Sequence, residues 1–144
     1  MDDARPLRIL LVEDNDDHAE LILRSLGDHH VLNKVTRAHD GAEALALLRN
    51  SANNELPDLM LLDLRLPKVD GLDVLSEVKS SDEWMGIPVV ILTTSDAEND
   101  LARAYKLKAN AYVTKPVDFS TFVKLMQDLG FFWLAWNRRP TRTD

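Results

Sequence analysis

Acidic, hydroxyl-bearing and basic side chains follow short apolar runs at four places in this sequence. The groups and their runs are Glu13-Asp14 after residues 8–12, Asp63 after residues 59–62, Thr93-Thr94 after residues 89–92, and Thr114-Lys115-Pro116 after residues 111–113. If the runs are parallel strands of an open α/β sheet, their carboxyl ends meet at one edge of that sheet. We therefore expect these side chains to converge there.

A cluster of carboxylates with one lysine would suit chemistry at phosphorus. Glu13, Asp14 and Asp63 would repel one another at close range, which a protein tolerates only when a cation is present. Magnesium is the natural candidate because it prefers oxygen ligands and keeps several waters. A carboxylate beside such an ion can attack phosphorus, since the ion and a nearby ammonium neutralise charge on the phosphoryl oxygens. Asp63 and Lys115 fit these two roles.

Each group also has an ordinary structural explanation when it is considered alone. Asp14 could cap a helix whose first turn is acidic, and Asp63 could lie in a solvated turn. Lys115 could be an exposed turn residue, and Thr93 and Thr94 could simply fill a strand end. If each explanation held separately, these groups would have to follow successive strands by coincidence. A single shared site explains why all of them occur at strand ends.

The elements that would position these groups alternate along the chain. Apolar runs predict strands at residues 8–12, 31–35, 59–62, 89–92 and 111–113. The segments between them have apolar residues three and four apart, which is typical of amphipathic helices. This alternation predicts a doubly wound α/β fold with a five-stranded parallel sheet in the order 2-1-3-4-5 and five helices on its two faces.

Composition limits the class of protein. The chain has 144 residues, 45% of them hydrophobic, so we expect residues 1–144 to form one domain. The absence of cysteine excludes disulfides and thiolate metal sites, and a net charge of -7 disfavours a nucleic-acid partner. No apolar stretch has the length of a membrane span and no export signal is visible. We expect a cytoplasmic protein without a membrane partner.

The sequence resembles the response regulator receiver family over essentially its whole length. The matching segments are Ile9-Leu-Leu-Val-Glu-Asp14, Asp63-Leu-Arg-Leu-Pro-Lys-Val-Asp-Gly71 and Tyr112-Val-Thr-Lys-Pro116. The resemblance implies a flavodoxin-like receiver fold and a two-component phosphorelay function. The protein would be a substrate of a sensor histidine kinase rather than an enzyme. Three segments are similar to those of short regulators that accompany phytochrome-type kinases: Leu92-Thr-Thr-Ser95, Asn110-Ala-Tyr-Val-Thr-Lys-Pro116 and the aromatic ending Phe132-Trp-Leu-Ala-Trp136.

The resemblance also implies roles for the acidic groups. Asp63 would be the phosphoacceptor, and Asp14 and Asp63 would bind Mg²⁺ directly. Glu13 would reach the ion mainly through water, and the backbone carbonyl of Arg65 would complete the protein ligands.

Three further residues would respond to the phosphoryl group. By the same resemblance, Thr93 is the switch hydroxyl, Tyr112 is the coupled aromatic residue, and Lys115 pairs with a phosphoryl oxygen. Phosphorylation adds charge and strong acceptor oxygens, so it would bias the fourth helix, fifth strand and fifth helix toward a second arrangement. That face is the expected signalling surface.

The residues after the last strand predict an extended helix or arm at about residues 118–137. Its apolar residues are spaced three and four apart, as in a coiled-coil seam. The expected interface residues of a homodimer are Phe122, Met126, Leu129, Phe132, Trp133 and Trp136. The alternative is that the stripe packs on the sheet and Gly130 ends the helix. No output domain is expected after it.

Other functions fit the sequence less well. A magnesium-dependent phosphatase of the haloacid dehalogenase type would also use a strand-end Asp nucleophile, but it needs a second Asp where this chain has Arg65. No glycine-rich nucleotide-binding motif is present. A receiver that only docks partners would not need its complete set of charged groups. The histidines at positions 18, 29, 30 and 39 lack metal-ligand spacing and are interpreted as solvated surface residues.

Overall fold

The computed structural model describes residues 7–27, 33–52, 55–93 and 98–115, together with Ser120 and Lys124. Within these residues the elements are β1 (Leu7–Val12), α1 (Asp16–Gly27), β2 (Asn33–Ala38), α2 (Gly41–Arg49), β3 (Leu59–Leu62), α3 (Gly71–Ser80), β4 (Val89–Thr93), α4 (Glu98–Lys106) and β5 (Ala111–Thr114). The predicted fifth helix, at about residues 118–137, lies outside the described residues except for Ser120 and Lys124, which are helical. No described helix has the length and apolar character of a membrane span.

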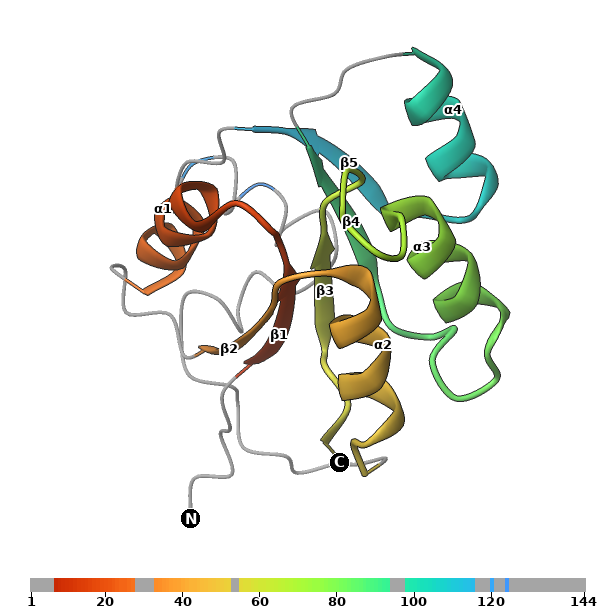
Figure 1. Ribbon diagram of the computed structural model, residues 1–144, viewed down its shortest axis with the longest axis horizontal. Coiled ribbons are helices and arrows are strands. Elements are labelled where there is room, and N and C mark those ends of the chain that lie inside the picture. Colours follow the sequence, from red (N-terminus) through yellow and green to blue (C-terminus); the bar gives the residue numbers. More distant parts are fainter. Residues whose placement is uncertain are drawn as a thin grey trace.

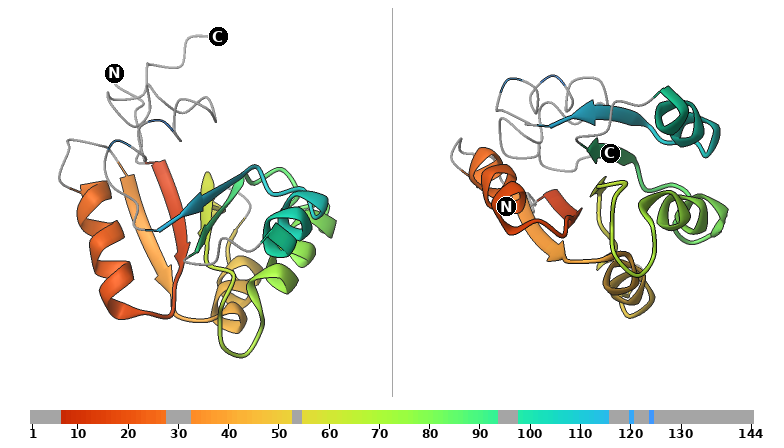
Figure 2. Two further views of the ribbon diagram at one scale, coloured as in Figure 1. Left: turned by 90° about the horizontal axis from the view of Figure 1, so that it is seen from above. Right: turned by 45° about the horizontal axis from the view of Figure 1, so that its top comes forward.

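The five strands form one parallel sheet in the order β2-β1-β3-β4-β5, as predicted. Helix α1 covers one face of the sheet, and α2, α3 and α4 cover the other (Figures 1 and 2). Right-handed connections between parallel strands place helices on both faces in this way. The described residues therefore form a three-layer α/β fold.

Successive residues of the central strands face opposite layers. In β1, Ile9 and Leu11 join the cluster that includes α1, whereas Leu10 and Val12 join the larger cluster under α2, α3 and α4. This alternation is the two-residue period of a strand. Strand β3 is buried at all four positions because helices cover both sides of it. The apolar runs in the sequence were therefore a good guide to the central strands.

Strand β2 is where the predicted boundaries were wrong. The prediction was residues 31–35, but β2 spans Asn33–Ala38 and pairs with β1 from Leu7 to Val12. Because β2 is an edge strand, it carries polar side chains at Lys34, Thr36 and Arg37 that interrupt the apolar run. Its second half therefore did not look like a buried strand. Strands β4 and β5 each continue one residue beyond their predicted ends.

Aspartates cap two helices at Asp-Gly pairs. Asp40 accepts a hydrogen bond from the Glu43 N–H at 2.7 Å, and Asp70 accepts one from the Leu72 N–H at 3.3 Å. A side chain at position 71 would place its Cβ 2.2 Å from the backbone oxygen of Asp63. Glycine therefore allows the start of α3 to pack directly against the loop that follows β3.

Candidate functional site

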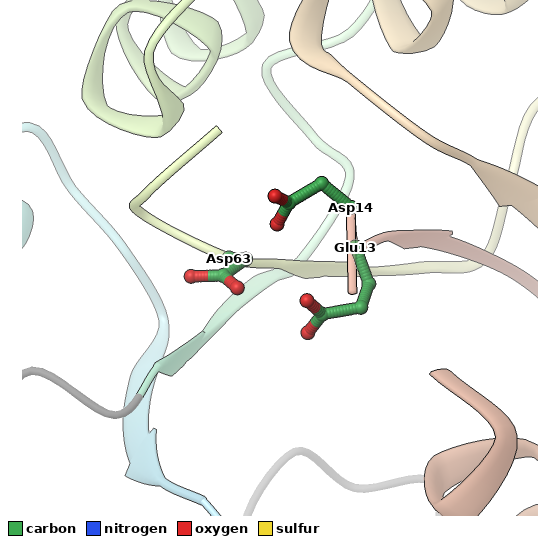
Figure 3. Close-up of side chains that lie close together, drawn as sticks. All are labelled: Glu13, Asp14 and Asp63. Carbon is green, nitrogen blue, oxygen red and sulfur yellow. The ribbon is translucent and has the colours of Figure 1, made fainter. Parts of the chain in front are cut away.

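Three carboxylates meet at the carboxyl edge of the sheet. Glu13 and Asp14 follow β1, and Asp63 follows the neighbouring strand β3 (Figure 3). Because Val12 and Leu62 are register partners, the residues after them leave the sheet side by side. One oxygen of each carboxylate lies within 4.8 Å of the others. The predicted convergence of these acids is confirmed.

The acidic cluster has a buried and an open side. Glu13 is 1% exposed and Asp63 is 6% exposed, whereas Asp14 is exposed to solvent. Burial raises the pKa of Glu13, and the nearby negative charge of Asp63 raises it further, while a hydrogen bond from Lys115 opposes both effects. Hard divalent cations prefer such oxygen ligands and retain waters on their open side. The donor set therefore fits a magnesium-like ion.

Lys115 brings a cation to the same cluster from β5. Its Nζ donates a hydrogen bond to Asp63 Oδ2 at 2.8 Å and another to Glu13 Oε1. The side chain is only 6% exposed, so these pairs lie in a poorly solvated environment. One ammonium cannot balance three ionised carboxylates. The site therefore retains an excess of negative charge that a divalent cation would neutralise.

The Asp63 carboxylate is held at both of its oxygens. Lys115 donates to Oδ2, and the backbone N–H of Arg65 donates to Oδ1 at 3.1 Å. The same loop is tied to α3 by a hydrogen bond from the Gly71 N–H to the Leu64 carbonyl at 3.0 Å. These contacts fix the direction of the carboxylate. The Arg65 carbonyl lies in this loop, and its role as a metal ligand stays a prediction.

Arg37, near the end of β2, binds the acidic loop, which we define as Glu13 to Asp16. The sequence analysis did not identify this residue. Its Nε and Nη2 donate to the Glu13 carbonyl at 3.0 and 2.9 Å, and its Nη1 pairs with Asp16 Oδ1 at 2.9 Å. The Asn15 N–H donates to Glu13 Oε2 at 3.1 Å. Arg37 therefore anchors the backbone that presents Glu13 and Asp14.

His18 corrects an interpretation made from the sequence. It was assigned to the solvated surface, but it is half-buried and its Nδ1 lies 3.1 Å from Lys115 Nζ. The spacing of the histidines could not reveal this contact because Lys115 lies 97 positions away. By contrast, His39 is exposed and pairs with Glu43 at 3.0 Å. His29 and His30 lie outside the described residues.

The remaining predicted residues are only partly described. Thr93 is the last residue of β4 and the register partner of Thr114, but its side chain lies outside the described part. Tyr112 is half-buried and packs against the larger apolar cluster. The predicted interface residues lie outside the described part as well: Phe122, Met126, Leu129, Phe132, Trp133 and Trp136.

Comparison with known proteins agrees with this site. The profile of the response regulator receiver domain matches residues 9–127. The chain is 44% identical to the probable methanogenesis regulatory protein FilR2 of Methanothrix harundinacea, covering 94% of this chain and 88% of that one. It is 38% identical to response regulator Rcp1 of Synechocystis, covering 92% and 93% of the two chains.

Solved structures give the same result. The bacteriophytochrome response regulator AtBRR is 50% identical, with a TM-score of 0.78 and coverage of 90% of this chain and 96% of that one. The Mn²⁺-bound form of Rcp1 has a TM-score of 0.74 at 39% identity, with coverage of 90% and 95%. Receiver domains are switches that are phosphorylated on an aspartate by histidine kinases, and they hold Mg²⁺ or Mn²⁺ in an acidic pocket. The comparisons give no support for the phosphatase alternative. This chain belongs to the response regulator receiver domain family.

Proposed function

We propose that Asp63 accepts a phosphoryl group from a sensor histidine kinase and that the phosphorylated protein signals through its α4, β5 and C-terminal helix face. The observation that carries this proposal is the Asp63 carboxylate itself. It is buried, held at both oxygens by hydrogen bonds, in contact with the Lys115 ammonium, and close to the acids Glu13 and Asp14. An isolated surface Asp would have none of these partners.

The contacts around Asp63 suit an attack on phosphorus. A carboxylate oxygen of Asp63 forms the new bond to phosphorus, and the bond between phosphorus and the donor histidine nitrogen breaks, leaving the kinase imidazole. Lys115 already lies against Asp63, so it can pair with the charge on the transferred oxygens without a large movement. The protein thus supplies a nucleophile and a counter-charge. The transferred group stays on Asp63 of the protein itself, which is why we propose a switch and not an enzyme.

We propose Mg²⁺ as the physiological ion of the acidic cluster. Asp14 and Asp63 would hold it directly, the Arg65 carbonyl would be a further ligand, and Glu13 would act mainly through water. The Mn²⁺-bound form of Rcp1 shows that a relative binds a divalent ion, which supports this proposal. When bound, the ion neutralises charge that develops on the phosphoryl oxygens. The three carboxylates and their oxygens within 4.8 Å provide the ligands.

The output side of the proposal involves Thr93 and Tyr112. These residues lie on the adjacent strands β4 and β5, where Thr93 pairs with Thr114 and Ile91 pairs with Tyr112. We propose that the Thr93 hydroxyl turns toward the phosphoryl group and that Tyr112 responds to this movement. The location of Lys115 directly after β5 would transmit the same event to this strand.

The partners are proposed from relatives and from the sequence. The likeness to a bacteriophytochrome response regulator supports a phytochrome-type kinase as the phosphoryl donor in the cytoplasm. We also propose that residues 1–144 form one receiver domain whose arm, at about residues 118–137, makes a homodimer. Removal of residues 131–136 should then give a monomer in sedimentation equilibrium. A truncated chain that stays dimeric would contradict the arm's role.

The phosphoacceptor is tested by intact-mass analysis after incubation with acetyl phosphate and Mg²⁺. We expect one added phosphoryl group on the wild-type chain and none on Asp63→Asn, because an amide is not a nucleophile toward phosphorus. A metal-free sample is the control for the ion. Asp58→Asn is a matched control, since Asp58 lies at the other end of β3, where it accepts a hydrogen bond from the Arg8 N–H at 2.9 Å. Uptake by Asp63→Asn would contradict the assignment.

A further inference from the structure

We propose that His18 is a positioning residue for Lys115: it holds one N–H of the ammonium in the unphosphorylated protein and releases it when Asp63 is phosphorylated. This inference rests on the proposed role of Asp63. It concerns a side chain that is neither an acid of the cluster nor a neighbour of Lys115 in sequence. The observation behind it is the 3.1 Å contact between His18 Nδ1 and Lys115 Nζ.

The Lys115 ammonium has three N–H groups, and the described residues offer it three acceptors. These acceptors are Glu13 Oε1, Asp63 Oδ2 and His18 Nδ1. An ammonium can donate three hydrogen bonds and accept none. With the side chain only 6% exposed, water is a poor substitute for a lost partner. Among the described residues, His18 is therefore the acceptor that satisfies the third N–H of this poorly solvated ammonium.

The position of His18 is itself fixed. It lies in the first turn of α1, where its backbone N–H donates to Asn15 Oδ1 at 3.0 Å. Because Lys115 can only donate, His18 Nδ1 must accept, and the neutral ring carries its hydrogen on Nε2. The contact joins α1 to the residue that follows β5, and the same Lys115 ammonium contacts Glu13 and Asp63.

Phosphorylation converts the Asp63 carboxylate into an acyl phosphate, so Lys115 loses an ionised carboxylate acceptor and gains several charged phosphoryl oxygens in its place. The phosphoryl oxygens carry negative charge, and Glu13 is buried and further held by the Asn15 N–H. An ammonium binds a charged phosphoryl oxygen more strongly than the imidazole nitrogen of His18, because only the phosphoryl oxygen adds an opposite charge. The ammonium should therefore exchange His18 for a phosphoryl oxygen. His18 thus stabilises the unphosphorylated form relative to the phosphorylated form.

Beryllofluoride is a probe for this exchange because its fluorines take the place of phosphoryl oxygens on the Asp63 carboxylate. The affinity of the full-length chain for beryllofluoride with Mg²⁺ can be measured by fluorine NMR. We expect His18→Phe, which keeps a ring but has no acceptor, to bind about fivefold more tightly than wild type. His18→Asn places an amide oxygen near the Nδ1 position and should restore wild-type affinity. The exposed His39→Asn is the control and should leave the affinity unchanged.

A second readout examines the unphosphorylated protein without beryllofluoride or metal. The Lys115 ammonium, assigned by its loss in Lys115→Arg, should exchange its hydrogens with water several-fold faster in His18→Phe, and His18→Asn should slow this exchange again. Unchanged exchange in His18→Phe, or unchanged or weaker beryllofluoride binding, would overturn the inference. If wild type binds no beryllofluoride, the proposed role of Asp63 fails instead, and the exchange measurement still decides whether His18 holds Lys115.

Discussion

The two ends of the central strands in this domain are built in opposite ways. At the carboxyl edge, the buried side chains of Glu13, Asp63 and Lys115 are charged. At the amino edge, β1, β2, α2 and the chain before β3 surround a cavity of about 200 Å³ with mixed apolar and polar walls. There the Arg8 N–H donates to Asp58 Oδ2 at 2.9 Å, and the Asp58 N–H donates to the Arg8 carbonyl at 2.8 Å.

This difference separates stability from function. Like charges gathered at the carboxyl edge repel one another and need a lysine and a metal ion, so they cost folding free energy. Apolar side chains toward the amino edge stabilise the same strands without any part in phosphoryl chemistry. Changes at the amino edge should therefore alter stability at constant metal affinity. Changes at the carboxyl edge should alter metal affinity.

The largest change in stability is expected for Leu48→Ala at the amino edge. Leu48 is buried in α2 and lines the cavity, so truncation would enlarge a void that already exists. The free energy of unfolding should fall by about 2–5 kcal/mol in urea titrations. Leu21→Ala is the control, because this exposed residue of α1 should change stability by no more than about 0.5 kcal/mol. A fall in Mg²⁺ affinity of the folded Leu48→Ala protein would show that the two edges are coupled.

Mg²⁺ should stabilise the carboxyl edge alone. An ion that binds only the folded chain adds about 2.7 kcal/mol to the unfolding free energy at a concentration one hundred times its Kd. Asp14→Asn should remove most of this gain, because Asp14 is the exposed acid of the cluster and the part of it that meets solvent. Asp17→Asn is matched to it as an exposed acid of α1 outside the cluster. Equal loss in both variants would mean that general charge, and not the cluster, binds the ion.

Arg37→Met tests whether the contacts of Arg37 with the acidic loop affect Mg²⁺ affinity. Methionine keeps an unbranched chain but loses both hydrogen bonds to the Glu13 carbonyl and the pair with Asp16. We expect about 1–3 kcal/mol less stability and about tenfold weaker Mg²⁺ binding, both measured by titration. Arg24→Met is the control, since Arg24 pairs with Glu20 on the exposed face of α1. Unchanged metal affinity in Arg37→Met would limit Arg37 to a role in folding.

The sequence predicted the carboxyl edge better than it predicted the contacts that support it. Strand ends and residue types were enough to bring Glu13, Asp14, Asp63 and Lys115 together, because parallel strands share one edge. The partnership of His18 with Lys115 depends on how α1 rotates over the sheet, which apolar spacing does not specify.

The edge strand and the C-terminal arm mark two other limits of the sequence. Arg37 was missed because β2 is an edge strand. Its polar residues interrupt the apolar run by which a buried strand is recognised. The polar contacts it makes depend on side-chain direction, which the pattern does not encode. The interface assigned to residues 118–137 stays a prediction, because its seam residues lie outside the described part.

The smallest expected change in stability is a gain, whereas truncation at the amino edge should cause a loss. Asp63→Asn removes a negative charge that faces Glu13 and Asp14. The single amide oxygen can still accept a hydrogen bond from Lys115, but the bond from the Arg65 N–H is lost. Without metal, the repulsion that is relieved should exceed the charge-assisted bond that is weakened, so the free energy of unfolding should rise by about 1 kcal/mol. Urea unfolding in a chelating buffer measures this change. A loss of stability would instead mean that the Lys115 pair outweighs the repulsion, and that the acceptor itself contributes to folding.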